Sequence, residues 1–374
     1  MHLKNRILRS AAAFFRSQPV LVIAFFAALA TVFIIPPDSG YKGYCSRTVL
    51  IQLFALMLAV SGFRSIGIFD RVTRYILQKT GSLRSLGRIM IVICFFTSML
   101  VTNDVALLTF VPLTVLIYKG IDDEKSRILT IVLETAAANL GSMMTPIGNP
   151  QNLFLYDEFH MTAAGFVRTM LPIGGISLVL LMAASFILPK TECAAPESET
   201  VSVSKMKAAV YGVLFALCLC SVLRLVPDYV CLIAAVAAAL ICDVKLLGKV
   251  DYALLATFVC FFVFVGNLAR IGTVSDFFCD ILSGREIVVA AALSQLISNV
   301  PAAVMLAGFT DNGKELLIGV NIGGLGTLVA SLASLISFQI YRKSEGAQPL
   351  RYLAVFTLTS IAFLAVLLPA AILM

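Results

Sequence analysis

Long apolar runs separated by short polar segments cover most of the chain. Apolar residues dominate over residues 18–36, 49–67, 169–188, 207–225, 229–242, 252–270 and 352–373. A run of about 20 apolar residues is the length that a helix needs to cross the hydrocarbon core of a bilayer. The pattern therefore predicts an all-α polytopic membrane protein.

Two further apolar stretches are interrupted near their middle by hydrogen-bonding residues. The stretch 89–118 contains Thr102, Asn103 and Asp104, and the stretch 287–309 contains Ser298 and Asn299. As a helix the arm 89–101 would extend only about 20 Å, whereas the hydrocarbon core is about 30 Å thick. We therefore predict two re-entrant helical hairpins, whose polar tips lie where lipid offers no hydrogen-bond partner.

Two more stretches, 128–156 and 315–341, are predicted to be transmembrane helices broken near their middle. Pro146, Gly148 and Pro150 interrupt the first, and Gly323 and Gly326 interrupt the second. Proline removes a backbone donor and glycine weakens a helix, so the backbone should unwind there, as it does at the binding sites of many transporters. A simple proline kink in the first stretch and close helix packing at the glycines of the second are the alternatives.

The two halves of the chain carry matching motifs. Asn139, Leu140, Gly141, Thr145, Asn149 and Asn152 align in order with Asn321, Ile322, Gly323, Thr327, Ser331 and Ser334. We divide the chain into an N-terminal repeat (1–190), a polar cytoplasmic linker (191–206) and a C-terminal repeat (207–374). An odd number of crossings between the repeat starts would invert the second copy, giving two inverted-topology repeats.

The distribution of basic residues predicts the orientation in the membrane. Lysine and arginine gather in the loops of one side, which is the cytoplasmic side by the positive-inside rule. The N-terminus is then cytoplasmic and the C-terminus lies on the outer side of the membrane. The basic segment from Arg71 to Arg88 is predicted to be an interfacial helix on the cytoplasmic side.

Composition excludes several classes of function. The chain is 60% hydrophobic and 13% charged, whereas soluble domains are about 25% charged. The formal charge of +7 is explained by membrane orientation, so no nucleic-acid partner is expected. His2 and His160 are the only histidines, and the nine cysteines lack metal-ligand spacing. Because no nucleophile and base converge in the apolar runs, we expect neither an enzyme nor a cofactor.

Inverted repeats with paired hairpins and paired broken helices are typical of secondary transporters, whose binding site lies where the breaks meet. The predicted substrate- and ion-binding residues are Thr102, Asn103, Asp104, Asn139, Thr145, Gly148, Asn149, Asn152, Ser298, Asn299, Asn321, Gly323, Thr327 and Ser331. Oxygen ligands suit a hard cation, so a Na⁺ ion is expected at Asn103, Asp104, Asn149 and Asn299. Helix N-termini that face the same cavity favour a small anion.

Several of these side chains also have a structural interpretation. A carboxylate at a hairpin tip is costly unless it is protonated, paired or bound to a cation. Asp104 therefore either carries the coupling cation, Na⁺ or H⁺, or caps the returning arm through backbone N–H groups. Asn103 and Asn299 are either ligands or turn residues that satisfy the backbone of the tip.

Polar residues outside the predicted site have simpler expectations. Glu134 is either a second proton carrier or, as we favour, a residue near the cytoplasmic mouth. Gln295 either faces the cavity or bonds the neighbouring arm. Arg64 and Arg270 are expected to be interfacial anchors whose long side chains reach toward water.

Taken together, four motifs resemble a known superfamily. These motifs are TNDVALLTFVPL, NLGSMMTPIGNPQN, SQLISNVPAAVML and NIGGLG, at residues 102–113, 139–152, 294–306 and 321–326. They resemble the ion transporter superfamily, which includes citrate transporters, arsenite efflux pumps, the Na⁺/H⁺ antiporter D family and divalent anion/Na⁺ symporters. The likeness covers nearly the whole chain and is strongest to citrate-transporter-like proteins of the bacterial inner membrane.

This resemblance implies a homodimer that works by an elevator movement, with a scaffold made largely of the first helix of each half. It implies ion-coupled transport of a small anion, such as citrate or another di- or tricarboxylate. Asp104 and Val300 stand where the symporters carry threonine, so arsenite efflux or Na⁺/H⁺ antiport is the alternative. A passive ion channel is the alternative of another class.

Overall fold

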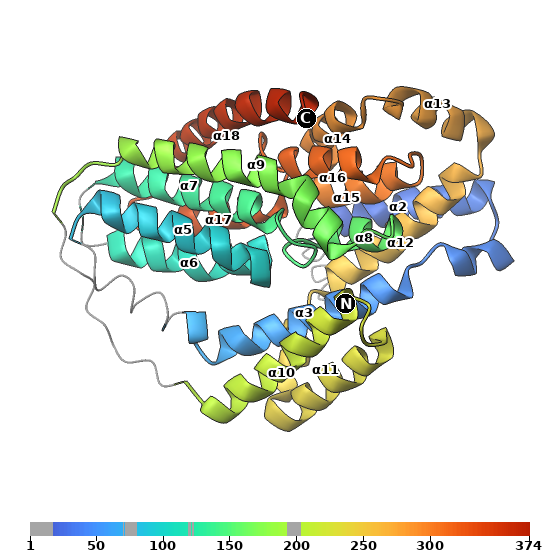
Figure 1. Ribbon diagram of the computed structural model, residues 1–374, viewed down its shortest axis with the longest axis horizontal. Coiled ribbons are helices and arrows are strands. Elements are labelled where there is room, and N and C mark those ends of the chain that lie inside the picture. The colour runs from blue at the N-terminus through green and yellow to red at the C-terminus, as the bar shows by residue number, and fades with distance from the viewer. Residues whose placement is uncertain (1–17, 70, 72–80, 119–120, 122, 193–202) are drawn as a thin grey trace, which may run out of the picture.

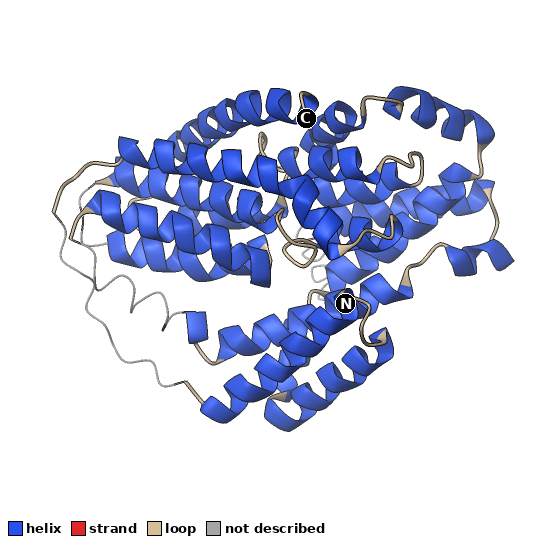
Figure 2. Cartoon of the chain, in the orientation of Figure 1, coloured by secondary structure: helices blue, strands red, loops and turns tan. Residues whose placement is uncertain are grey.

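The computed structural model describes residues 18–69, 71, 81–118, 121, 123–192 and 203–374, and every regular element in these residues is a helix (Figure 2). The first half contains α2 (Pro19–Ile34), α3 (Arg47–Ser65), α5 (Leu83–Val101), α6 (Asn103–Tyr118), α7 (Glu124–Ser142), α8 (Pro150–Glu158) and α9 (Ala163–Ala184). The second contains α10 (Lys205–Val222), α11 (Asp228–Cys242), α12 (Tyr252–Ala269), α13 (Gly272–Leu282), α14 (Glu286–Ile297), α15 (Asn299–Ala307), α16 (Gly313–Ile322), α17 (Leu332–Arg342) and α18 (Pro349–Ile372). Three short 3₁₀ helices, η1 (Ser39–Gly43), η2 (Ser185–Ile187) and η3 (Val244–Lys249), complete the described elements.

The predicted all-helical membrane fold is confirmed. Six of the described helices are long and apolar enough to cross a membrane: Arg47–Ser65, Leu83–Val101, Ala163–Ile187, Lys205–Val222, Tyr252–Ala269 and Pro349–Ile372. Re-entrance of the hairpins and inversion of the second half relative to a membrane stay predictions. Half of the predicted interfacial helix and most of the predicted linker fall on residues 72–80 and 193–202, which lie outside the described residues.

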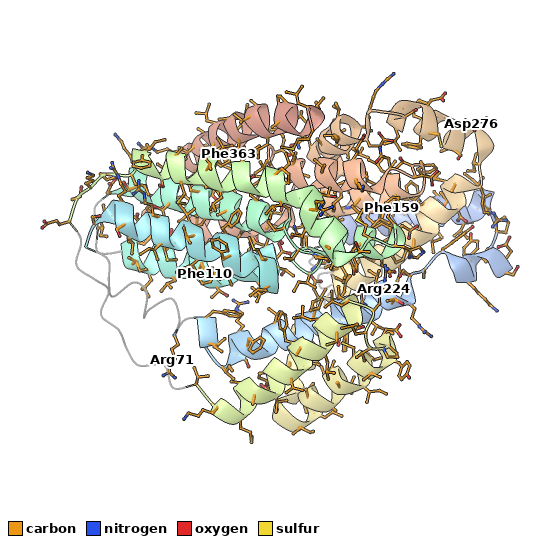
Figure 3. The ribbon with its side chains drawn as sticks, in the orientation of Figure 1. Arg71, Phe110, Phe159, Arg224, Asp276 and Phe363 are labelled. Carbon is orange, nitrogen blue, oxygen red and sulfur yellow. The ribbon has the colours of Figure 1, made fainter. Side chains whose placement is uncertain are left out.

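The helices pack into two groups (Figure 1). The hairpin bundle consists of α5 to α9 and α14 to α18, in which α7 packs against α5, α6, α9, α17 and α18. Phe110 and Phe363 are buried within this bundle (Figure 3). The flanking bundle consists of α2, α3, α10, α11 and α12, in which α12 packs along α2 and α3 packs against α10 and α11. The hairpins and the broken helices therefore share one bundle, which lies against the other.

The first hairpin begins earlier than the sequence pattern indicated. Its first arm is α5, which has 19 residues from Leu83 and so is about 28 Å long, where we had expected an arm starting at residue 89. The Ser82 side chain caps this helix by accepting a hydrogen bond from the Ser85 N–H at 3.3 Å. Arg84 Nε donates to the Leu188 carbonyl at 2.6 Å and Arg88 Nε to Ser185 Oγ at 2.9 Å. Because both arginines donate to residues next to α9, basic residues that resembled an interfacial segment belong to the arm.

Arg270 has a partner that the sequence pattern did not reveal. Its guanidinium forms an ion pair with Asp38 at 2.7 Å, and it also donates to Tyr44 Oη at 3.0 Å. The Arg270 guanidinium lowers the pKa of the Asp38 carboxyl below its usual range. Arg270 therefore ties the end of α12 to the segment between α2 and α3, and its role as an interfacial anchor stays a prediction.

Candidate functional site

The two hairpin tips have the same unusual backbone. Thr102, between α5 and α6, has φ 73° and ψ 149°, and Ser298, between α14 and α15, has φ 77° and ψ 154°. This region of φ/ψ space is populated almost entirely by glycine and costs about 1–3 kcal/mol per residue. Such strain in both halves must be held in place by the surrounding contacts.

Those contacts repeat between the halves. The Asn103 N–H donates to the Gly148 carbonyl at 3.3 Å, and the Asn299 N–H donates to the Ala330 carbonyl at 2.9 Å. Under the alignment of the two repeats, Gly148 and Ala330 are equivalent positions. Each tip is therefore bonded to the break of its own half.

The threonines of the two breaks form equivalent hydrogen bonds. Thr145 Oγ1 donates to the Met99 carbonyl, and Thr327 Oγ1 donates to the Gln295 carbonyl at 3.1 Å. Gln295 itself bonds the second break, because its Nε2 donates to the Gly323 and Leu325 carbonyls and its Oε1 accepts from the Thr327 N–H. Thr145, Thr327 and Gln295 thus tie the first arm of each hairpin to a break rather than offering their polar atoms to a ligand.

Glycine is required at both breaks because another segment of backbone lies too close for a side chain. A Cβ atom on Gly148 would lie 2.0 Å from the Ser142 carbonyl oxygen, and one on Gly323 would lie 2.8 Å from Ala291 Cα. Pro150 then starts α8 at a position where its missing N–H costs nothing. Gly148 and Gly323 therefore shape the site through close packing, and neither contributes a side chain to it.

The two broken helices meet through buried amides. Asn139 Oδ1 accepts from Asn103 Nδ2 and from Ser331 Oγ, both at 2.9 Å, and Asn139 Nδ2 donates to Ser334 Oγ at 3.1 Å. In the equivalent contact of the other half, Asn321 Nδ2 donates to Asn152 Oδ1 at 2.7 Å.

These two contacts relate equivalent positions across the repeat. Asn321 corresponds to Asn139, and Asn152 corresponds to Ser334. The motif alignment made from the sequence therefore describes real structural equivalence, and Asn139 is the residue that joins one hairpin tip to the break of the other half.

Two amide oxygens at this centre have no hydrogen-bond partner among the described residues. They are Asn149 Oδ1 and Asn321 Oδ1, whose residues are only 3% exposed. Asn149 Nδ2 is bonded to Ser142 Oγ at 2.7 Å, which fixes the orientation of the amide and leaves the oxygen free. A buried acceptor without a donor is destabilising, and a hard cation would satisfy it.

The first tip faces a cavity of about 260 Å³ between the two bundles. Thr102, Asp104 and Asn149 line it from the hairpin bundle, and Ile147 and Pro150 from the first break and the start of α8. The sequence pattern missed that the flanking bundle adds charged residues to the same cavity, namely Arg64, Lys249 and Asp251. A site restricted to the breaks would have lacked these charges.

The second tip faces a smaller cavity of about 210 Å³, lined by Ser298, Val300 and Pro301. Asp251 and Leu254, at the start of α12, line both cavities. The start of α12 therefore separates the two hairpin tips.

Arg64 was predicted to be an interfacial anchor, and the structure places it at this cavity instead. Its Nη2 donates to the Leu108 carbonyl of α6 at 3.2 Å. Pro112 lies four residues after Leu108 within α6 and has no N–H to donate to that carbonyl. Arg64 thus supplies the donor that proline removed, and it links the flanking bundle to the first hairpin.

Asp104 is half-buried at the tip and lines the cavity. Among the described residues no hydrogen bond or ion pair reaches its carboxylate, and the Asp104 N–H donates to Asn103 Oδ1 at 2.9 Å. The side chain that serves the backbone of the tip is therefore Asn103, and Asp104 stays free for a cation or proton.

Replacing Thr102 with glycine is expected to raise stability while lowering transport. Glycine accepts the backbone conformation of the tip, so relief of strain should outweigh the added chain entropy by about 1 kcal/mol. Loss of the side chain at the cavity should lower transport. The measurement is the apparent melting temperature of purified protein together with substrate uptake, with Thr97→Gly, inside α5, as a control that should only destabilise. A lower melting temperature for Thr102→Gly would contradict the claim of strain.

The sequence model of the citrate transporter family, CitMHS, matches residues 11–312 of this chain. The chain belongs to the citrate transporter family. The resemblance inferred from the hairpin and break motifs is thereby confirmed, and this member of the citrate transporter family is a transporter and not an enzyme. A small-molecule substrate and a membrane environment follow from the family.

Relatives of this citrate transporter family member are themselves transporters or membrane proteins. It is 34% identical over 295 residues to an uncharacterized transporter of Methanocaldococcus jannaschii, covering 78% of this chain and 80% of the relative. It is 28% identical over 295 residues to the inner membrane protein YbiR of Escherichia coli, covering 78% and 79%. Its fold is similar to that of the YdaH transporter of Alcanivorax borkumensis, with a TM-score of 0.58, 13% identity and coverage of 92% and 87%. The last likeness concerns the fold alone.

Proposed function

We propose that this chain is an ion-coupled secondary active transporter that moves a small anion by alternating access. The favoured substrates are di- or tricarboxylates such as citrate. The observation that carries the proposal is the cavity at the first hairpin tip, where Asp104 and Asn149 of one bundle face Arg64 of the other. Its volume of about 260 Å³ is close to the lower end of small-molecule sites, which begin at about 300 Å³.

The charges around this cavity support an anionic substrate. Arg64 and Lys249 supply cationic groups that the breaks themselves lack. An arginine can bind a carboxylate with two parallel hydrogen bonds, which adds geometric selectivity. The guanidinium of Arg64 is therefore proposed to meet one carboxylate of the substrate.

Oxygen atoms without a hydrogen-bond partner support a coupling cation at the cavity of the first hairpin tip. Of the residues expected to bind Na⁺, Asn103 is occupied by Asn139 and by the Asp104 N–H. Asn149 Oδ1 and the Asp104 carboxylate remain available. A Na⁺ ion or a proton at Asp104 would neutralise the acidic group that otherwise repels an anion.

The two-bundle packing supports an elevator movement of the hairpin bundle along the flanking bundle. The hydrogen bonds between the bundles in the described residues include Arg64 to the Leu108 carbonyl, Arg224 Nη2 to the Tyr156 carbonyl at 3.3 Å, and Ser46 Oγ to the Asp157 carboxylate at 2.9 Å. Exposed apolar side chains on α11, such as Ile233 and Ile241, would contact lipid or a second copy in the proposed homodimer.

A second candidate function is arsenite efflux or Na⁺/H⁺ antiport. It is favoured by the unpaired carboxylate of Asp104 at the first tip, because a single titratable group suits exchange of cations better than binding of a multiply charged anion.

Uptake into proteoliposomes tests both candidates. Labelled citrate and succinate are offered under an imposed Na⁺ gradient or pH gradient, with Asn103→Ala, Asp104→Asn and the remote control Asn312→Ala. We expect accumulation above equilibrium with one of the gradients, at least tenfold less accumulation in Asn103→Ala, and no change in Asn312→Ala. Absence of accumulation, with Na⁺-driven proton movement or pH-driven arsenite movement, would favour the second candidate. Flux that only equilibrates, whatever the gradient, would indicate a channel.

A further inference from the structure

Glu134 is a buried carboxyl group that the proposed transport site does not use. It lies in the middle of α7 and is 0% exposed, so the expected place near the cytoplasmic mouth was wrong. Its Oε1 is hydrogen-bonded to Thr114 Oγ1 of α6 at 2.5 Å. Its Oε2 is buried and has no partner among the described residues. The Thr114 hydroxyl group is therefore the one hydrogen-bond partner of this carboxyl group among the described residues.

The helices around α7 bring no cation to Glu134. Their titratable residues are Arg84, Arg88 and Cys94 on α5, Asp104 and Tyr118 on α6, Arg168 on α9, Lys314 and Glu315 on α16, Tyr341 and Arg342 on α17, and Arg351 and Tyr352 on α18. Cys94 and Tyr352 interact electrostatically with Glu134, and both side chains are ordinarily neutral near pH 7.

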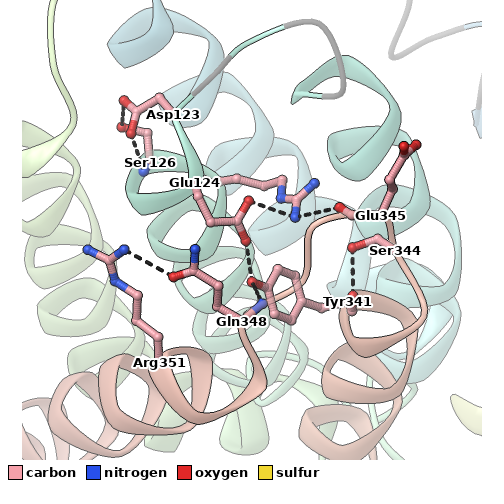
Figure 4. A network of polar contacts seen from close by, with 9 residues as sticks. Asp123, Glu124, Ser126, Tyr341, Ser344, Glu345, Gln348 and Arg351 are labelled. Carbon is pink, nitrogen blue, oxygen red and sulfur yellow. Dashed lines mark hydrogen bonds and ion pairs between the residues drawn. The ribbon is translucent and has the colours of Figure 1, made fainter.

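The nearest basic residue along α7 is already engaged. Arg127 lies two turns before Glu134 and forms an ion pair with Glu124 at 2.6 Å. Glu124 also accepts from Tyr341 Oη in the polar network at the start of α7 (Figure 4). An ionised Glu134 would thus be an uncompensated charge in a dry interface, which proteins avoid by protonation.

A second buried glutamate provides a contrast. Glu286 is 4% exposed, its Oε1 accepts from Thr310 Oγ1 at 3.0 Å, and its Oε2 likewise has no partner among the described residues. Glu286 is, however, the first residue of α14, where the helix N-terminus stabilises a negative charge. Glu134 has no helix N-terminus beside it, so Glu286 is a matched control for the effect of that position.

A cavity of about 250 Å³ lies along the outer face of α6 and is lined by Pro112, Val115, Leu116, Arg127, Ser344 and Glu345. Thr114 is 0% exposed and does not line it, because Thr114 lies on the opposite face of the helix. Pro112 weakens α6 locally. Exchange of a proton between Glu134 and water therefore requires α6 to move.

We propose that Glu134 is a proton-binding site of the hairpin bundle, holding one proton in the described conformation and exchanging it with water when α6 moves at Pro112. In the exchange the carboxylic acid O–H bond breaks, the proton passes to a water molecule and the carboxylate remains. The inference rests on the proposed function in one respect, since it makes H⁺ a coupling ion of the transport cycle.

Infrared difference spectroscopy of the full chain in lipid vesicles tests the site without any transported substrate. The wild-type minus Glu134→Gln spectrum should contain the C=O stretch of a protonated carboxylic acid, and this band should shift when D₂O replaces water. The wild-type minus Glu286→Gln spectrum should lack it. Thr114→Val should move the band without removing it, which keeps the test decisive if Glu134→Gln folds poorly. Absence of the band, or a band that never shifts in D₂O, would overturn the proposal.

The coupling claim has its own measurement. Glu134→Gln should lose at least tenfold in citrate accumulation driven by a pH gradient while keeping citrate counterflow at wild-type rates. Intact pH-driven accumulation in Glu134→Gln would overturn H⁺ coupling through this residue. If wild-type vesicles move no citrate, the proposed substrate fails, and the infrared measurement still decides the proton site.

Discussion

Replacing Asn139 with alanine is expected to abolish transport and to cause the largest loss of stability of any single polar substitution at this site. The Asn139 amide bonds Asn103, Ser331 and Ser334, and it is 5% exposed. Each buried partner left unsatisfied costs about 1–3 kcal/mol. Because the partners share one network their costs do not simply add, and we expect a loss of about 3 kcal/mol or more.

The loss of transport has a separate cause. Asn103 carries the first hairpin tip, and Ser331 belongs to the break of the other half. Without Asn139 the two no longer share a partner, so the tip should lose its position relative to the break. A small misplacement of a binding group can cost orders of magnitude in rate.

The measurement compares Asn139→Ala with Asn139→Asp and Asn312→Ala. The aspartate variant keeps both acceptor contacts and replaces only the amide donor to Ser334, at the added cost of a buried carboxyl group, so it should melt below wild type. Asn312 makes no side-chain capping bond and should tolerate alanine. An Asn139→Ala protein that melts and transports like wild type would show that the crossing of the broken helices does not depend on this residue.

The elements could be predicted from the sequence because a membrane imposes simple patterns. Apolar length gives the spanning helices, and paired prolines, glycines and amides mark the breaks at Gly148 and Gly323. The alignment of the two halves pairs Gly148 with Ala330, and the Asn103 and Asn299 N–H groups donate to the carbonyls of these two residues. These signals are local in sequence, so they can be read without a structure.

What could not be predicted depends on contacts between distant segments. The start of α5 was missed because Arg84 and Arg88 donate hydrogen bonds to residues next to α9, about a hundred residues later. The burial of Glu134 depends on four or more helices closing around α7. Arg64 looked like an anchor because nothing in its own segment indicates that the α6 carbonyl freed by Pro112 lies beside it.

Replacing Arg64 with glutamine is expected to weaken anion binding by about tenfold to a hundredfold, which corresponds to about 1.5–3 kcal/mol for a charged hydrogen bond. The cavity then retains one basic residue, Lys249, against Asp104 and Asp251. An anion would meet a net negative lining in place of a balanced one. The half-saturating citrate concentration should rise, and the exposed control Arg168→Gln should leave it unchanged.

Arg64 has two possible roles, and a substitution at Pro112 can distinguish them. If Arg64 serves only to donate to the Leu108 carbonyl, then Pro112→Ala restores the backbone donor within α6 and makes the arginine dispensable. If Arg64 binds the anion, the loss of affinity in Arg64→Gln persists in the Pro112→Ala background. We expect the loss of citrate affinity to persist. The two substitutions should have independent effects on citrate affinity but not on the apparent melting temperature, because Arg64 and Pro112 are coupled only through the Leu108 carbonyl. Full rescue of citrate affinity by Pro112→Ala would remove Arg64 from the binding site and leave it as a contact between the bundles.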